Sequence, residues 1–170
     1  MKTGGILLLV GSIVFSVIWI FVAVGVNAEW QTKIGANWTL ADKSSTIAEK
    51  SDYINKFVVA LEGAKLEGTN DALFFPTPNN SFDLNLKALK TLQARLETIK
   101  TMKQDSFEYQ TAIQQITAQE QGEAQEMLSV LQGSWYKVNH YLLWNSLIFL
   151  FGIIFICIMF FAGLIMLMDY

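Results

Sequence analysis

The feature that most constrains this sequence is a pair of long apolar runs without charged residues, one near each end. The first extends from Ile6 to Val26 and the second from Leu142 to Met168. A helix of about 20 apolar residues, rising about 1.5 Å per residue, crosses a hydrocarbon core of roughly 30 Å. Both runs are long enough, so the sequence predicts two transmembrane helices.

Composition supports this interpretation. Of the 170 residues, 52% are hydrophobic and only 16% are charged, which is unusually apolar for a soluble domain. Apart from Lys2 and Asp169, every charged residue lies between Glu29 and Lys137. We therefore expect an N-terminal transmembrane segment (1–28), a water-facing domain (29–140) and a C-terminal transmembrane helix (141–170).

The first apolar run has two interpretations. It follows Met1-Lys2 and ends at the small residues before Glu29, as in a cleavable signal peptide. However, it is longer than the roughly 7–15 residues of a typical signal-peptide core, which favours an uncleaved signal-anchor. We expect a plasma or inner membrane protein with cytoplasmic termini and an extracytoplasmic middle domain. Glycosylation triplets at Asn37 and Asn79 are compatible with this orientation but do not establish it.

The middle domain is predicted to be helical, with one strong break at 68–83, which contains both prolines, Pro76 and Pro78. Before the break, apolar residues recur every seven positions, as in a coiled coil, and after it they follow three- and four-residue spacing. Gly68 is a candidate C-cap, and Ser81 or Asp83 a candidate N-cap. The favoured fold is an all-α protein in which two transmembrane helices flank a helical hairpin.

A small four-helix bundle is the alternative. The two legs of the hairpin differ in length, and a bundle would remove this mismatch. It needs two further turns, for which Gly35 and residues 104–106 are weak candidates.

Three groups of residues are candidate contact sites. At the 68–83 turn, three large apolar residues would lie far from the membrane and form either a partner site or a cap on the hairpin. In the first apolar run, Ser12 and Ser16 are spaced to admit another helix. Four residues at the ends of the apolar runs are candidate interfacial anchors. The turn residues and the anchors are Leu73, Phe74 and Phe75, and Trp30, Trp135, His140 and Trp144.

No catalytic, cofactor or metal site is predicted. With one histidine and one cysteine, the chain has no internal disulfide and no histidine–cysteine metal cluster. His140 is either a pH-sensitive group or an interfacial polar residue. Cys157 lies within the second apolar run, where a small apolar role is favoured over modification. The weakly acidic middle domain is not expected to bind nucleic acid.

A two-helix hairpin buries too little apolar surface to be stable alone. We therefore expect other membrane subunits, further copies of the chain, or both, as partners beside the lipid bilayer. The favoured function is that of a non-enzymatic accessory or structural subunit of a membrane complex. The alternative is a ligand-sensing or transducing subunit that acts through a partner. A polar pocket near Tyr53, Arg95 and Tyr109 would favour sensing, and a closed helix seam would favour a structural role.

Overall fold

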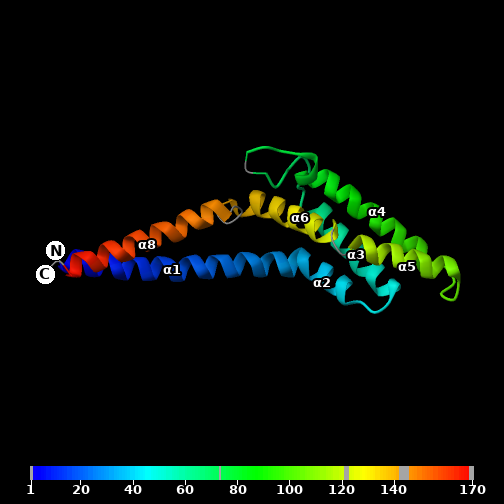
Figure 1. Ribbon diagram of the computed structural model, residues 1–170, viewed down its shortest axis with the longest axis horizontal. Coiled ribbons are helices and arrows are strands. Elements are labelled where there is room, and N and C mark those ends of the chain that lie inside the picture. The colour runs from blue at the N-terminus through cyan, green and yellow to red at the C-terminus, as the bar shows by residue number, and fades with distance from the viewer. Residues whose placement is uncertain (1, 73, 121–122, 142–145, 169–170) are drawn as a thin grey trace. The chain divides into compact units, whose positions relative to one another are not determined.

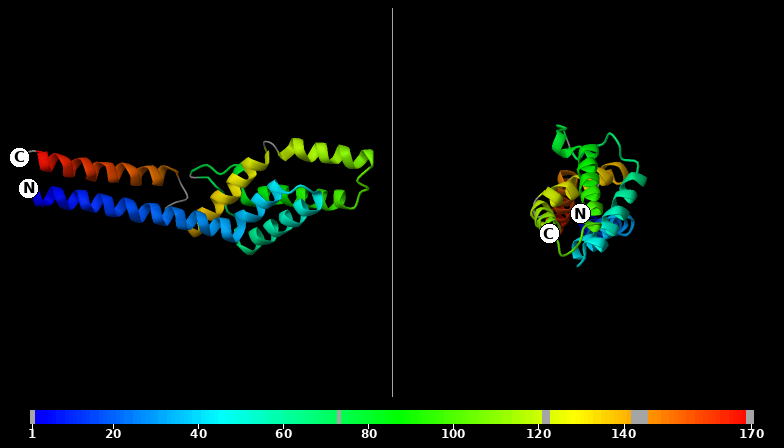
Figure 2. Two further views of the ribbon diagram at one scale, coloured as in Figure 1. Left: turned by 90° about the horizontal axis from the view of Figure 1, so that it is seen from below. Right: turned by 90° about the vertical axis from the view of Figure 1, so that its right-hand side faces the viewer.

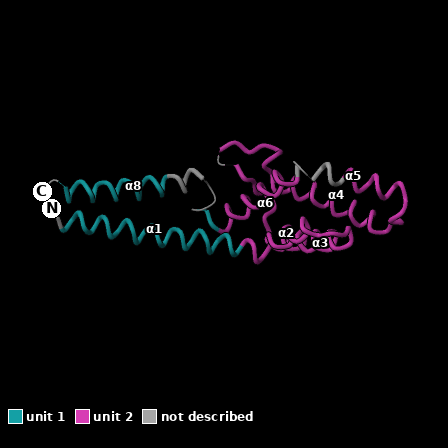
Figure 3. The backbone as a smooth tube through the Cα atoms, turned by 60° about the horizontal axis from the view of Figure 1, so that its bottom comes forward, with its two compact units in different colours: residues 1–29, 140–170 teal, residues 30–139 magenta. Residues whose placement is uncertain are grey.

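The computed structural model describes the backbone of residues 2–72, 74–120, 123–141 and 146–168, and the side chains in these ranges except at 2, 116–120, 123 and 146–150. Every regular element in these ranges is a helix, apart from one isolated antiparallel bridge between Asn70 and Ser81. The prediction of an all-α protein is confirmed. The chain forms two units (Figures 1 and 3): unit 1 comprises Met1–Glu29 and His140–Tyr170, and unit 2 comprises Trp30–Asn139.

Unit 1 contains two apolar helices, α1 (Lys2–Trp30) and α8 (Ser146–Met168). By length and composition, the described residues include two helices able to cross a membrane, one in each apolar run. The two helices are antiparallel (Figure 2), since Phe15 lies against Phe155 at one level and Gly5 against Gly163 at another. Each is packed along one face, and large apolar side chains elsewhere on its surface are exposed.

The closest approach of α1 and α8 occurs where both lack side chains. A Cβ atom added to Gly5 would lie 2.9 Å from the carbonyl oxygen of Gly163, and one added to Gly163 would lie 2.9 Å from Cγ of Leu9. Small residues allow helix backbones to approach in this way, which increases their van der Waals contact.

Unit 2 contains the remaining helices. Helical structure continues from α1 through a π-helical turn, η1 (Gln31–Gly35), into α2 (Ala36–Lys43). There follow α3 (Ile47–Gly63), α4 (Phe82–Lys100), α5 (Phe107–Glu120) and α6 (Glu123–Asn139). Helix α3 packs against α2 and α4, and α6 packs against α4 and α5. Along unit 2, α2 and α4 run in one direction, and α3, α5 and α6 run in the opposite direction (Figure 1).

The middle of the chain therefore runs along unit 2 four times, in alternating directions. The hairpin favoured from the sequence, with only two such passes, is wrong in this respect. The missed turn lies at residues 44–46. There the side chain of Thr46 accepts a hydrogen bond from the backbone N–H of Glu49 at 3.2 Å and caps α3. The seven-residue apolar pattern predicts one continuous helix across residues 44–46, where the structure has a break. Within α3, Ile54 and Leu61 are buried, but Leu40 in α2 is exposed.

The break expected near residues 104–106 is present between α4 and α5. The break at 68–83 is also present, although α3 ends at Gly63 rather than near Gly68. Gly68 has a φ of 75°, which glycine adopts readily, and it lies in the loop instead of capping the helix. The side chain of Ser81 caps α4 by accepting from the N–H of Leu84. Asp83, the other candidate, accepts a hydrogen bond from the N–H of Gly68 at 3.0 Å.

The core of unit 2 lies where α3, α4 and α6 meet. Burying a large apolar side chain is worth about 1.5–3 kcal/mol relative to leaving it exposed. The fully buried apolar side chains of these helices are Phe57, Leu61, Phe82, Leu89, Leu96 and Leu131. They make the α3–α4 seam a closed apolar contact.

Candidate functional site

A polar cluster crosses the α3–α4 seam beside this core. The hydroxyl of Ser51 donates to Oε1 of Glu97 at 2.5 Å, and the amide of Asn55 donates to the same oxygen at 2.8 Å. The amide of Gln93 then donates to Oδ1 of Asn55 at 2.8 Å. Because Ser51 and Asn55 are in α3 while Gln93 and Glu97 are in α4, these bonds fix the register of the two helices.

The cluster changes the acidity of its carboxylates. Hydrogen bonds from Ser51 and then Asn55 lower the pKa of Glu97, since both stabilise its charged form. At the same seam, Nζ of Lys100 lies 2.9 Å from Oδ1 of Asp52. This hydrogen bond and ion pair lower the pKa of Asp52 and raise that of Lys100. The α3–α4 seam is thus held by charge-assisted bonds as well as apolar contact.

The three residues proposed to line a sensing pocket lie on three helices: Tyr53 on α3, Arg95 on α4 and Tyr109 on α5. The Tyr53 ring has Nζ of Lys56, from the same helix, 5.0 Å from its centroid. Arg95 is exposed on α4. The α3–α4 seam is closed by the Ser51–Glu97 cluster and by the buried core side chains.

A second polar arrangement fastens the α3–α4 loop (residues 64–77) onto α6. Nζ of Lys137 donates to Oδ1 of Asn70 at 3.0 Å and to the carbonyl oxygen of Ala72 at 2.8 Å. One turn earlier in α6, the carboxylate of Asp71 lies over Gly133, in space that a Cβ atom would fill. The backbone N–H of Asp71 also donates to the carbonyl oxygen of Asn80 at 2.9 Å. The base of the loop is therefore held from two sides.

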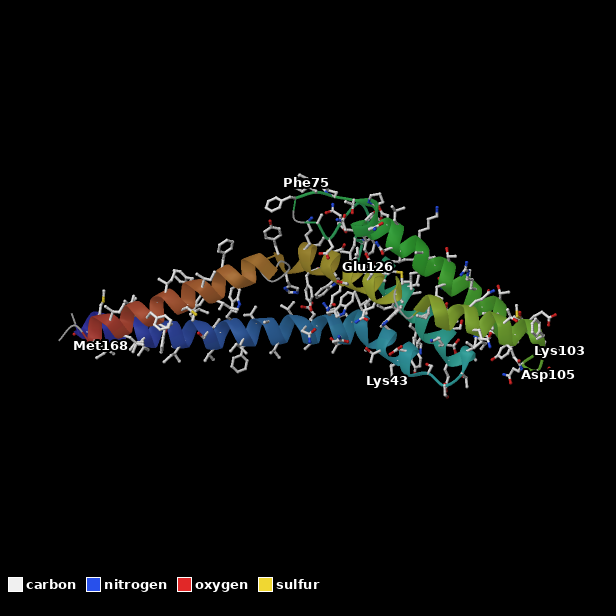
Figure 4. All side chains as sticks on the ribbon, viewed as in Figure 1. Lys43, Phe75, Lys103, Asp105, Glu126 and Met168 are labelled. Carbon is white, nitrogen blue, oxygen red and sulfur yellow. The ribbon has the colours of Figure 1, made fainter. Side chains whose placement is uncertain are left out.

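This attachment corrects the expected place of the aromatic turn. Phe74 and Phe75 are on the loop and are 73% and 84% exposed. They follow directly after the segment bound by Lys137, which is close to the end of unit 2 at Asn139. Figure 4 shows Phe75 away from Lys103 and Asp105, which lie at the opposite end of the unit. The turn was expected far from the apolar runs because only two passes were expected. Leu73, the third residue of that prediction, lies outside the described residues.

The predicted tryptophan anchors differ from expectation. Trp30 and Trp135 are only 1% and 4% exposed, and their ring centroids are 5.5 Å apart within unit 2. Their rings pack in the protein core, so neither is placed to contact headgroups. Gly35 makes room for this packing, because a Cβ atom there would lie 2.6 Å from Nε1 of Trp30. The indole of Trp144 lies outside the described part of the chain.

Next to this pair, Tyr136 carries a ring contact with Trp135 and accepts a hydrogen bond from the amide of Gln132 at 3.3 Å. Burial raises the pKa of the Tyr136 phenol, and the bond from Gln132 opposes that shift. The end of α6 is thus an aromatic cluster.

The expected helix-packing serines lie in unit 1. Ser12 is buried and donates to the carbonyl oxygen of Leu9 at 2.9 Å, and Ser16 donates to the carbonyl oxygen of Ser12 at 2.7 Å. Both hydroxyls therefore bond within α1. The close approach of Gly5 and Gly163 was not predictable from sequence spacing, because its only signal is that each residue is glycine in an apolar run.

His140 has a carboxylate partner in unit 1, because its Nε2 lies 3.0 Å from Oε2 of Glu29. This pair is ionic only when the imidazole is protonated. Cys157 is exposed on α8. Among the described residues, no three histidine, cysteine or carboxylate side chains are grouped closely enough to hold a metal ion.

Comparison with protein-family models, with curated proteins and with solved structures finds no match to this chain. The chemistry must therefore be inferred from the arrangement itself. Its built features are a seam fixed by hydrogen bonds, a loop fastened to α6, and two apolar helices with exposed outer faces.

Proposed function

We propose that this chain is a non-enzymatic accessory subunit of a membrane-protein complex. In this proposal, α1 and α8 cross the bilayer as an antiparallel pair, and unit 2 projects from the extracytoplasmic side as a rigid helical domain. The complex forms through the outer faces of the apolar helices and the surface of unit 2.

The observation that carries the proposal is that contact between α1 and α8 covers only a small part of the surface of each helix. The pair packs along a single stripe through Gly5, Ser12 and Gly163. Several of the largest side chains point away from that stripe and are more than half exposed, among them Phe21, Val24, Phe151, Ile158 and Phe161. Lipid tails and the helices of other subunits are the surroundings that suit such side chains.

Unit 2 supports a structural role rather than a catalytic one. Its helices are fixed by a closed core and by the Ser51–Glu97 and Asp52–Lys100 bonds. It also presents an apolar residue for contact at the turn between α4 and α5, where Phe107 is exposed. A stiff domain with contact residues suits the spacing and holding of neighbours.

The test is the native mass of the chain after extraction in a mild detergent, with the co-purifying chains identified by mass spectrometry. The proposal predicts a discrete complex that contains other membrane proteins in a fixed ratio. A homo-oligomer alone would contradict the accessory role. A folded monomer would contradict assembly altogether, and ligand sensing would then become the better explanation.

A further inference from the structure

The most exposed aromatic pair of unit 2 is Phe74 and Phe75. Their rings are neighbours, with centroids 6.4 Å apart, and both point away from the core. Exposed apolar patches generally mark contact surfaces, because leaving such side chains in water is unfavourable.

The pair is held in place by the structure around it. Two residues before Phe74, Ala72 accepts a hydrogen bond from Lys137 through its carbonyl oxygen. After it, the N–H of Thr77 donates to Oδ1 of Asn80 at 2.8 Å, which orders the return of the chain. Pro76 and Pro78 restrict the backbone between and beyond these bonds. The rings thus extend from a loop that is fixed at both sides.

Chain length limits how far the pair can lie from the start of the second apolar run. Lys137 lies five residues before Leu142, a segment that spans at most about 18 Å. From Ala72 to Phe75 the chain spans at most about 11 Å, and the Lys137 side chain with its bond to Ala72 adds roughly 9 Å, so Phe75 lies within about 38 Å of Leu142. The turn between α4 and α5, in contrast, lies at the opposite end of α4 from this loop, and the 19 residues of α4 measure about 28 Å.

We propose that Phe74 and Phe75 insert into the interfacial layer of the same bilayer that α1 and α8 cross, and so form a third membrane contact. This inference rests on the proposed function, because it needs α8 to span the membrane. Aromatic side chains at the headgroup level bury their rings among the upper acyl chains. The contact would hold the α3–α4 loop, and through Lys137 the end of α6, against the membrane surface.

Charge around the loop indicates which lipid surface fits. The charged residues on the loop and at its base are of both signs: Glu67, Asp71 and Asp83 are acidic, and Lys65 and Lys137 are basic. Attraction to anionic lipid would need a cluster of lysines or arginines instead. The contact is therefore apolar, and it should form on a zwitterionic phosphatidylcholine surface without anionic lipid.

The test uses the full chain in phosphatidylcholine vesicles with one environment-sensitive fluorophore. The reporter is the Phe74→Cys, Cys157→Ser variant, which keeps Phe75. The matched control is the Asp105→Cys, Cys157→Ser variant, whose label sits on the exposed turn between α4 and α5. We expect blue-shifted emission at position 74 and quenching by lipids that carry a nitroxide near the headgroup. The label at position 105 should show neither effect.

A third sample separates failure of this inference from failure of the proposed function. The unchanged chain carries one cysteine, Cys157, in α8, and its label should be quenched by lipids with a deep nitroxide. If Cys157 is quenched and position 74 is not, the loop inference is wrong. This includes the case of blue-shifted emission without lipid quenching, which would indicate a protein partner. If Cys157 is not quenched, α8 does not span the membrane and the proposed function is wrong.

Discussion

Glu97 accepts hydrogen bonds from two α3 side chains, and this links the stability of the α3–α4 seam to pH. Its folded pKa lies below the ordinary value of a glutamate side chain, chiefly because of the hydrogen bond from Ser51. A depressed carboxyl pKa contributes stability above the unfolded value, and that contribution is lost as the pH falls through the folded pKa. Asp52 acts in the same direction through Lys100.

Glu97→Gln should therefore weaken the acid dependence of unfolding. Glutamine retains an oxygen that can accept from Ser51 and Asn55, but it loses the charge that strengthens these bonds. We expect a lower melting temperature at neutral pH and a smaller loss of stability between about pH 5 and pH 3. Thermal unfolding followed by circular dichroism over this range measures both. An unchanged acid dependence would show that Glu97 is not linked to folding.

Gly35 is the second residue whose identity matters, because the Trp30 indole occupies the space beside it. Gly35→Ala should displace this buried ring and destabilise unit 2 by about 1–3 kcal/mol, the usual cost of overpacking. The matched control is Gly63→Ala in α3, where a Cβ atom meets nothing within 4 Å. In a thermal unfolding experiment, the control should be neutral or slightly stabilising. Equal effects of the two changes would contradict this packing.

At the scale of elements, the glycine contact between α1 and α8 is the feature with the sharpest test. Gly5→Ala places a methyl group against the backbone of α8, whereas the same change at Gly25 in α1 meets open space. We expect Gly5→Ala to separate the helices and Gly25→Ala to leave them in place. Disulfide formation between cysteines introduced at Phe15 and Phe155, in a Cys157→Ser background, reports their separation. Equal cross-linking in both variants would contradict the close approach.

The elements also show what sequence patterns can predict. Long apolar runs identify α1 and α8 because length and the absence of charge are local properties. Ser81 could be predicted as the cap of α4 for the same reason. The turn at 44–46 was missed although Thr46 and Glu49 have the spacing of a capping box, because the heptad pattern was given more weight. That error changed the number of passes, and with it the expected place of Phe74 and Phe75.

The contacts of the candidate sites were harder to predict. Lys137 and Asn70 are far apart in sequence, as are Ser51 and Glu97, so no local pattern pairs them. Likewise, the tryptophans at the ends of the apolar runs satisfy the pattern of interfacial anchors. Only the fold shows that Trp30 and Trp135 face each other. Pairing of distant residues depends on the order of the helices, which periodicity does not determine.

For the whole molecule, we propose a membrane-anchored helical domain. The outer faces of its apolar helices remain exposed and available to other subunits. Unit 2 has its own buried core, whereas α1 and α8 have only their shared stripe. The two units should therefore respond differently to their surroundings: harsh detergent should separate partners from unit 1 before unit 2 unfolds.

The most direct test is site-specific photo-cross-linking in native membranes. A photoreactive residue is placed at Phe21, which is 73% exposed on α1, and at Ser12, which is buried. The account predicts a discrete adduct with another membrane protein from position 21, and only intramolecular products from position 12. A second photoreactive residue is placed at Phe161, which is 60% exposed on α8. Lipid adducts alone at positions 21 and 161 would contradict the claim that this chain is a subunit of a complex.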